Sequence, residues 1–152
     1  MTSPPSLKHV FDLHVDVGTP IDIGPLGRGR RRSVPIVGGT FEGSGVSGTI
    51  LGGADHQIVR DDDVVEIEAR YTLRTGGGAL IGVHSAGMRH APADVMKRLL
   101  AGEAVDPAQV YFRTAITFET SAPELAWLMR SIFLGVGTRH PNEVVMRVWR
   151  VG

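Results

Sequence analysis

The 152-residue chain contains no cysteine, which excludes disulfide bonds, thiolate metal sites and thiol nucleophiles. It also lacks an excess of charge, because 16 basic and 16 acidic residues cancel, so no long-range field attracts nucleic acid or anionic lipid. No apolar run approaches the roughly 20 residues that a membrane-spanning helix needs, and the first residues lack the apolar core of a signal peptide. We therefore expect a cytoplasmic protein that binds neither nucleic acid nor membranes.

Hydrophobic residues make up 42% of the chain and charged residues 21%, which is typical of a folded globular domain. The chain has 20 glycines and 9 prolines, and most of them fall between short apolar segments, as turns between strands require. We expect residues 1–6 to form a flexible tail and residues 7–152 to form a single domain.

Apolar and polar residues alternate in several segments, and this period of two predicts β-strands. In the clearest segment, Phe112, Ile116 and Phe118 share one face, whereas Arg113 and Glu119 share the other. Residues 18–29 are expected to form turns. The predicted strands cover residues 7–17, 32–41 (extending toward residue 46), 54–59, 64–75, 79–86, 110–120, 132–136 and 143–151.

Two helical signals interrupt the strands. Pro92 and Gly102 bracket an apolar stripe, which predicts a helix over residues 92–101. A capping pattern that starts at Ser121 predicts a short helical turn carrying Leu125 and Leu128. Strands joined mostly by hairpins favour an eight-stranded antiparallel up-and-down barrel, because closure removes exposed edges. We expect the helix at 92–101 to cap one mouth; a two-sheet β-sandwich is the alternative.

Several segments together resemble a known family. They are 35–43, 52–55, 69–73, 111–114, 118–120 and 126–128, within a match that spans about residues 9–151. In order and spacing they are similar to the bacterial and fungal family DUF3237, whose members have no general established activity. The resemblance implies a closed β-barrel. This chain has His56 where the family usually has tryptophan, and Met129 where it tends to have asparagine, so the resemblance implies an altered ligand preference.

The candidate catalytic residues are Asp55, Arg70, Arg113 and Glu119. If their faces look into the barrel, the two guanidinium groups could bind a carboxylate or an enolate, and a carboxyl group could transfer a proton. This hypothesis predicts a cofactor-independent isomerase, cyclase or lyase that acts on a small organic acid or carbonyl compound. A non-catalytic binding protein and a structural oligomer without a pocket are the alternatives, with Arg113 and Glu119 then facing solvent.

Further candidate ligand-binding residues surround this group, although each also has a simpler interpretation as a core or solvated residue. Aromatic residues fill barrel cores first, and an isolated histidine or glutamate in a turn is commonly solvated. The candidates are Glu42, His56, Tyr71, His84, Tyr111, Trp127 and Met129.

Three other patterns are not interpreted as sites. Asp12, His14 and Asp16 alternate along one strand and lie too far apart to bind one metal ion. Residues 43–48 match a glycine-rich dinucleotide motif, but no helix follows them to hold a pyrophosphate. The arginines of residues 28–32 are expected to lie in a solvated loop or to contact an acidic neighbour in a homo-oligomer. We therefore expect no metal and no cofactor.

Overall fold

The computed structural model describes residues 2–152, which form nine strands, one α-helix and two short 3₁₀ segments. None of the helical segments among these residues has the length and hydropathy needed to cross a lipid bilayer. The strands are β1 (Leu7–Val17), β2 (Ile21–Pro25), β3 (Arg30–Gly43), β4 (Val46–Val59), β5 (Val65–Thr75), β6 (Leu80–His90), β7 (Tyr111–Glu119), β8 (Ile132–Arg139) and β9 (Glu143–Val151). The helical segments are α1 (Ala93–Leu100), η1 (Pro107–Gln109) and η2 (Pro123–Arg130).

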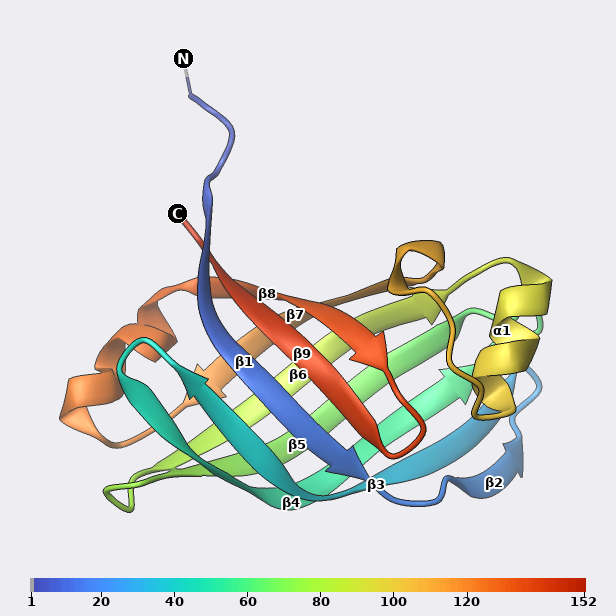
Figure 1. Ribbon diagram of the computed structural model, residues 1–152, viewed down its shortest axis with the longest axis horizontal. Helices are drawn as coiled ribbons and strands as arrows, with labels where there is room; N and C mark the ends of the chain where they lie inside the picture. The colour runs from blue at the N-terminus through green and yellow to red at the C-terminus, as the bar shows by residue number, and fades with distance from the viewer. Residues whose placement is uncertain (1) are drawn as a thin grey trace.

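Eight strands close into an antiparallel barrel (Figure 1). Strands β3 to β9 pair in chain order, β9 pairs with β1, and β1 returns to β3, so the predicted barrel is confirmed and the sandwich is not. The expectation of turns throughout residues 18–29 is wrong at β2, which pairs with Arg30–Ser33 of β3. The pairing of β1 with β3 ends at Val17, so the first residues of β3 have a free edge. The extra strand β2 forms by pairing with this edge.

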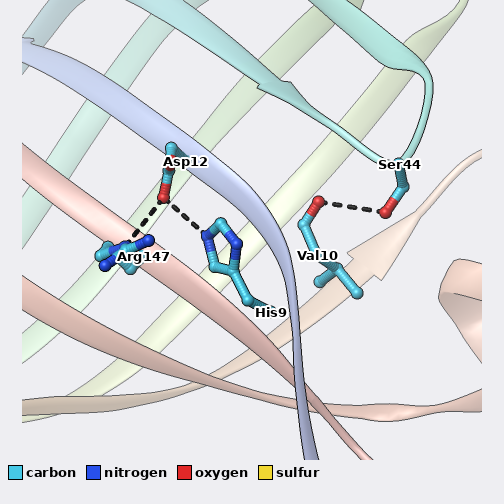
Figure 2. Close-up of polar contacts among 5 residues, drawn as sticks. All are labelled: His9, Val10, Asp12, Ser44 and Arg147. Atoms are coloured by element: carbon cyan, nitrogen blue, oxygen red, sulfur yellow. Dashed lines mark hydrogen bonds and ion pairs between the residues drawn. The ribbon is translucent and has the colours of Figure 1, made fainter.

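Side chains reinforce the seam where β1 joins its two neighbours (Figure 2). Asp12 accepts a hydrogen bond from Arg147 on β9 at 3.3 Å and lies 2.8 Å from Nε2 of His9. Ser44, in the turn between β3 and β4, donates a 3.0 Å hydrogen bond to the carbonyl oxygen of Val10. The outer-face aspartate that we did not interpret as a metal ligand therefore belongs to a structural ion pair.

Strict alternation decides which side chains fill the barrel. On β5 the apolar members are buried and the polar members lie outside, so the pattern reads as one inner and one outer face. The inner residues of this strand are Val65, Ile67, Ala69, Tyr71 and Leu73.

The two ends of the barrel differ in composition. At the end where β7 stops, η2 packs Trp127 against Phe11 and Phe133, with ring centroids 6.0 Å apart in both pairs. Phe118 contacts Phe133 edge-on at 5.0 Å, so this half is a solid aromatic core. The predicted helix is confirmed as α1, which lies at the opposite end, beyond the end of β6 (Figure 1). Its buried residues are Val95, Met96 and Leu99.

Two inward-facing glycines on β8 make room for large neighbours. A Cβ atom on Gly137 would lie 2.7 Å from ring atoms of Phe112, and one on Gly135 would lie 2.5 Å from the sulfur of Met146. These distances are too short for an added methyl group, so the packing of the inner wall depends on the absence of side chains at both positions.

We predict that Gly137→Ala lowers the free energy of unfolding by about 1–3 kcal/mol, because an overpacked core strains its neighbours. Urea unfolding measures the change. Gly82→Ala on β6 is the matched control, since its Cβ would meet no atom closer than 3.7 Å. Equal stability of the Gly137 variant and the wild type would contradict the described packing.

Candidate functional site

The half of the barrel next to α1 encloses a cavity of about 50 Å³. Its walls are mostly apolar and include Val34, Ile67, Phe112 and Met146, but polar groups converge on it from five strands. These polar residues are Arg32, Asp55, Gln57, Tyr71, Ser85, Arg89 and Arg139. Small-molecule sites share this pattern of apolar walls with a few converging polar groups, although this cavity is smaller than most of them.

Strand alternation places the arginines inside. Arg32 shares a face of β3 with the buried Val34, and Arg89 shares a face of β6 with the buried Ser85. Arg139 follows the buried Gly137 two residues further along β8. All three arginines lie near the ends of their strands, at the same mouth of the barrel. This end of the interior is ionic, whereas the end beneath η2 is aromatic.

A chain of hydrogen bonds orients the carboxyl group of Asp55. Arg32 Nε donates to Gln57 Oε1 at 2.6 Å, and Gln57 Nε2 donates to Asp55 Oδ2 at 2.7 Å. The other carboxyl oxygen, Oδ1, accepts the backbone N–H of Glu68 at 2.9 Å. A guanidinium can only donate, so Arg32 determines which end of the Gln57 amide faces Asp55. A proton gained by Asp55 must then point away from both of these donors.

Burial raises the pKa of Asp55, and the hydrogen bonds from Gln57 and Glu68 together with the charges of Arg89 and Arg32 only partly offset this effect. Burial and the nearby Asp55 also raise the pKa of Tyr71, so its phenol stays protonated at neutral pH. The cavity thus presents a carboxyl group that can exchange a proton beside a phenol that can donate a hydrogen bond.

Arg89 is the most deeply buried cation of the site, with 3% of its surface exposed. Its guanidinium lies 5.5 Å from the centre of the Phe112 ring, and its Nε has no hydrogen-bond acceptor among the described residues. Burial and repulsion from Arg32 and Arg139 lower the pKa of Arg89 to about 10. Arg89 therefore remains charged at neutral pH in a site that disfavours its charge.

The other two arginines are less buried. Burial lowers the pKa of Arg32, although Asp55 opposes the effect. Burial and then repulsion from Arg32 lower the pKa of Arg139, which donates a hydrogen bond to the carbonyl oxygen of His140. The mutual repulsion of the three guanidinium groups shows that they share one electrostatic environment.

The structure separates the four predicted catalytic residues. Asp55 lines the cavity, whereas Arg70, Arg113 and Glu119 do not meet the condition that their faces look into the barrel. These three side chains lie on the outer faces of β5 and β7, because the apolar residues that alternate with them occupy the interior. Burying those apolar residues is more favourable than burying unpaired charges.

Arg70, His84 and Glu119 nevertheless come together outside the barrel. They line an open surface groove of about 310 Å³, in which Gly52, Gly53 and Gly82 also take part. The Nε2 atom of His84 lies 3.5 Å from Glu68 Oε1, without the geometry of a hydrogen bond. The predicted group of charges therefore exists in part, but on the solvent side of the sheet.

Among the other candidates, Tyr71 lines the cavity and the rest lie elsewhere. Tyr111 is exposed, stacks on His90 at 4.9 Å and lies 5.3 Å beneath the guanidinium of Arg113. Trp127 belongs to the aromatic half, and Met129 on η2 is exposed. The placement of Trp127 against the core agrees with the simpler interpretation that aromatic residues fill the barrel interior, whereas Tyr111 lies outside the barrel.

His56 and Glu42 also lie on the outer surface. The backbone carbonyl of His56, on the outer face of β4, accepts a hydrogen bond from Arg31. Glu42 lines a separate shallow groove with His14, Asp16 and Glu143. No group of three or more metal-ligating side chains is arranged around a common point within residues 2–152.

Arg32 lines the cavity, although the sequence analysis placed it with the solvated arginines of residues 28–32. Arg28 lies between β2 and β3, but Arg30, Arg31 and Arg32 all belong to β3 and not to a loop. Arg30 pairs with Asp22 at 2.6 Å, but Arg32 turns into the cavity. The signal was available, since Arg32 has the same parity as Val34 and Ile36.

Gln57, Arg89 and Arg139 were also missed. The predicted strands ended at residues 86 and 136, so Arg89 and Arg139 fell outside them, although the structure extends β6 to His90 and β8 to Arg139. Gln57 has the parity of Asp55 on β4. Extending two alternating patterns by three residues would have placed Arg89 and Arg139 inside, and Gln57 already lay in the predicted strand 54–59.

The family model described as "Protein of unknown function (DUF3237)" matches residues 5–151. The chain belongs to this family. It is 41% identical to a UPF0311 protein of Rhodopseudomonas palustris over 152 residues, which are 99% of both chains. It is 38% identical to a UPF0311 protein of Clostridium acetobutylicum, over 95% of this chain and 92% of the relative.

Several solved structures share this fold. A conserved protein of unknown function from Rhodopseudomonas palustris superposes with a TM-score of 0.94 at 40% identity, over 100% of both chains. A beta-barrel like protein from Acinetobacter baumannii gives 0.87 at 36% identity, over 100% of this chain and 99% of the other. An enzyme from Penicillium herquei gives 0.75 at 19% identity, over 100% and 98%, which shows the fold alone.

We predict that the ionisation of Asp55 destabilises the folded protein. Its folded pKa is raised, so its contribution to stability is complete below the unfolded pKa of about 3.9 and is lost as pH rises through the folded value. The difference in unfolding free energy between wild type and Asp55→Asn should therefore fall as pH rises across this range. Urea unfolding at a series of pH values measures it.

Asp12→Asn is the control with the opposite sign. Partial burial raises the pKa of Asp12, but its bonds to His9 and Arg147 lower it overall, so its stabilising contribution is lost as pH falls through the folded value. A flat or rising difference for Asp55→Asn would contradict the described environment of Asp55.

Proposed function

We propose that this protein is a cofactor-independent acid–base enzyme that acts on a small organic acid or carbonyl compound inside the barrel. The observation that supports this function best is the position of Asp55, a half-buried carboxyl group with a raised pKa in a cavity that three arginines share. Perturbed titrating groups in a cavity are typical of catalytic sites.

The roles of the residues follow from their chemistry. Asp55 accepts a proton from a carbon next to a carbonyl group, because a raised pKa makes a carboxylate a stronger base. Arg89 and Arg139 stabilise the negative charge that develops on the substrate oxygen. Arg32 acts through Gln57 and holds Asp55 in place. Isomerisation, cyclisation and elimination of carbonyl compounds all proceed through removal of such a proton. We therefore place the enzyme among the isomerases, cyclases or lyases.

A non-catalytic ligand-binding protein is the second candidate. It is favoured by the unpartnered Nε of Arg89, because binding an acceptor would satisfy this donor without any reaction. A barrel without a pocket agrees less well with the cavity. The fungal neighbour described as an enzyme supports the view that the fold is compatible with catalysis. A homo-oligomer and a cytoplasmic location stay predictions from the sequence.

We predict that Asp55→Asn lowers proton transfer by about 100-fold or more, since general bases contribute factors of this size. The assay follows deuterium incorporation from solvent into 2-oxo and 3-oxo carboxylic acids by NMR. Asp12→Asn, which alters only an outer ion pair, should retain the wild-type rate.

Glu119→Gln separates the cavity from the outer groove as the reaction site. The proposal expects it to retain activity, because Glu119 lines the groove outside the barrel. Loss of exchange in Glu119→Gln with full activity in Asp55→Asn would refute the cavity site. Binding of the acids without exchange in the wild type would favour the ligand-binding alternative.

A further inference from the structure

The charges that line the cavity do not balance. Among the described residues, Asp55 is the one carboxylate in the cavity wall, whereas Arg32, Arg89 and Arg139 contribute three positive charges. The formal charge of the site is plus two when Asp55 is ionised. The neighbouring pair of Arg30 and Asp22 is neutral as a unit and does not change this balance.

A hydrogen-bond donor without an acceptor also indicates that negative charge is missing from the cavity. Arg32 uses Nε for Gln57, and Arg139 uses one terminal nitrogen for the carbonyl oxygen of His140. Arg89 is 3% exposed, and its Nε meets no acceptor within residues 2–152. A buried guanidinium nitrogen without an acceptor is disfavoured, so an anion that accepts a hydrogen bond from Arg89 Nε would stabilise the folded site.

We infer that the cavity takes a small dianion, and that its substrate class is the short dicarboxylic acids. A monoanion would leave one positive charge uncompensated in the cavity, and a neutral carbonyl compound would leave two. A planar carboxylate matches the fork of a guanidinium group, and the apolar walls formed by Val34, Ile67 and Phe112 suit a short carbon skeleton. This inference rests on the proposed function, because it takes the same cavity as the ligand site.

Titration calorimetry with matched probes tests the charge requirement. Malonate and succinate are each compared with their monomethyl and dimethyl esters, at fixed ionic strength and at a pH that ionises every free carboxyl group. We expect at least one diacid to bind, and to bind about tenfold or more tightly than its monoester, which corresponds to about 1.4 kcal/mol. The diester should bind more weakly still. Equal affinities within each series, tighter binding of the esters, or no binding by any diacid would overturn the inference.

Two variants test which residues supply the charge. Arg89→Met should reduce the preference for the diacid over the monoester about tenfold, while Arg74→Met, an exposed arginine on the outer face of β5, should leave it unchanged. Arg139→Gln provides a second test at a half-buried position if Arg89→Met does not fold. A preserved preference in a folded cavity variant would contradict the inference.

Asp55→Asn separates this inference from the proposed function. Removing the one negative charge of the cavity should increase diacid affinity several-fold, whether or not the wild type catalyses a reaction. Tighter binding in Asp55→Asn without exchange activity in the wild type would refute catalysis and support the dianion site. Exchange activity on neutral ketones, with no diacid binding, would support catalysis and refute the dianion site.

Discussion

The desolvation of Arg89 is the constraint around which the polar half of this barrel is arranged. A guanidinium on the inner face of β6 cannot reach bulk water, and the nearest aromatic ring, Phe112, offers only a weak partner. Asp55, which the Arg32–Gln57 hydrogen bonds hold in place, supplies one negative charge that partly compensates Arg89. Burial of this carboxyl group raises the pKa of Asp55. Arg89 and Asp55 thus influence each other's pKa, and Arg89 keeps one nitrogen without an acceptor among the described residues, whereas both oxygens of Asp55 accept hydrogen bonds.

The barrel tolerates this strain because its other half provides the packing. Phe11, Phe118 and Phe133 form a dense core beneath η2, and the eight-stranded closure leaves few unpaired backbone groups. The aromatic core that stabilises the fold and the polar cavity therefore lie at opposite ends of one sheet. Each strand contributes packing residues at one end, and several contribute an ionic residue at the other.

Much of the fold was predictable from the sequence, because alternation and turn residues are local signals. The strand at 143–151 and the helix within 92–101 are found where they were expected, and the pairing of β1 with β3 and β9 selects the barrel over the sandwich. β2 was not predictable in the same way. Its five residues include a glycine and a proline, and it forms only because β3 offers a free edge.

The site was predicted less well, for a physical reason. Asp55 and Tyr71 were identified, but the proposed group required Arg70, Arg113 and Glu119 to face inward, where the alternating apolar residues of the same strands lie instead. The arginines that do enter lie at strand ends, where alternation is hardest to read and where a long side chain can still reach the mouth. Charge placement in a barrel thus depends on where each strand ends, which is the least certain part of a sequence-based prediction.

A crystal structure of the protein grown with malonate would test the central claim most directly. The account predicts density for the anion inside the barrel, with an oxygen within hydrogen-bond distance of Arg89 Nε and contacts to at least one of Arg32 and Arg139. A cavity filled by side chains, or malonate bound only outside the sheet with Arg89 paired to a protein acceptor, would contradict it.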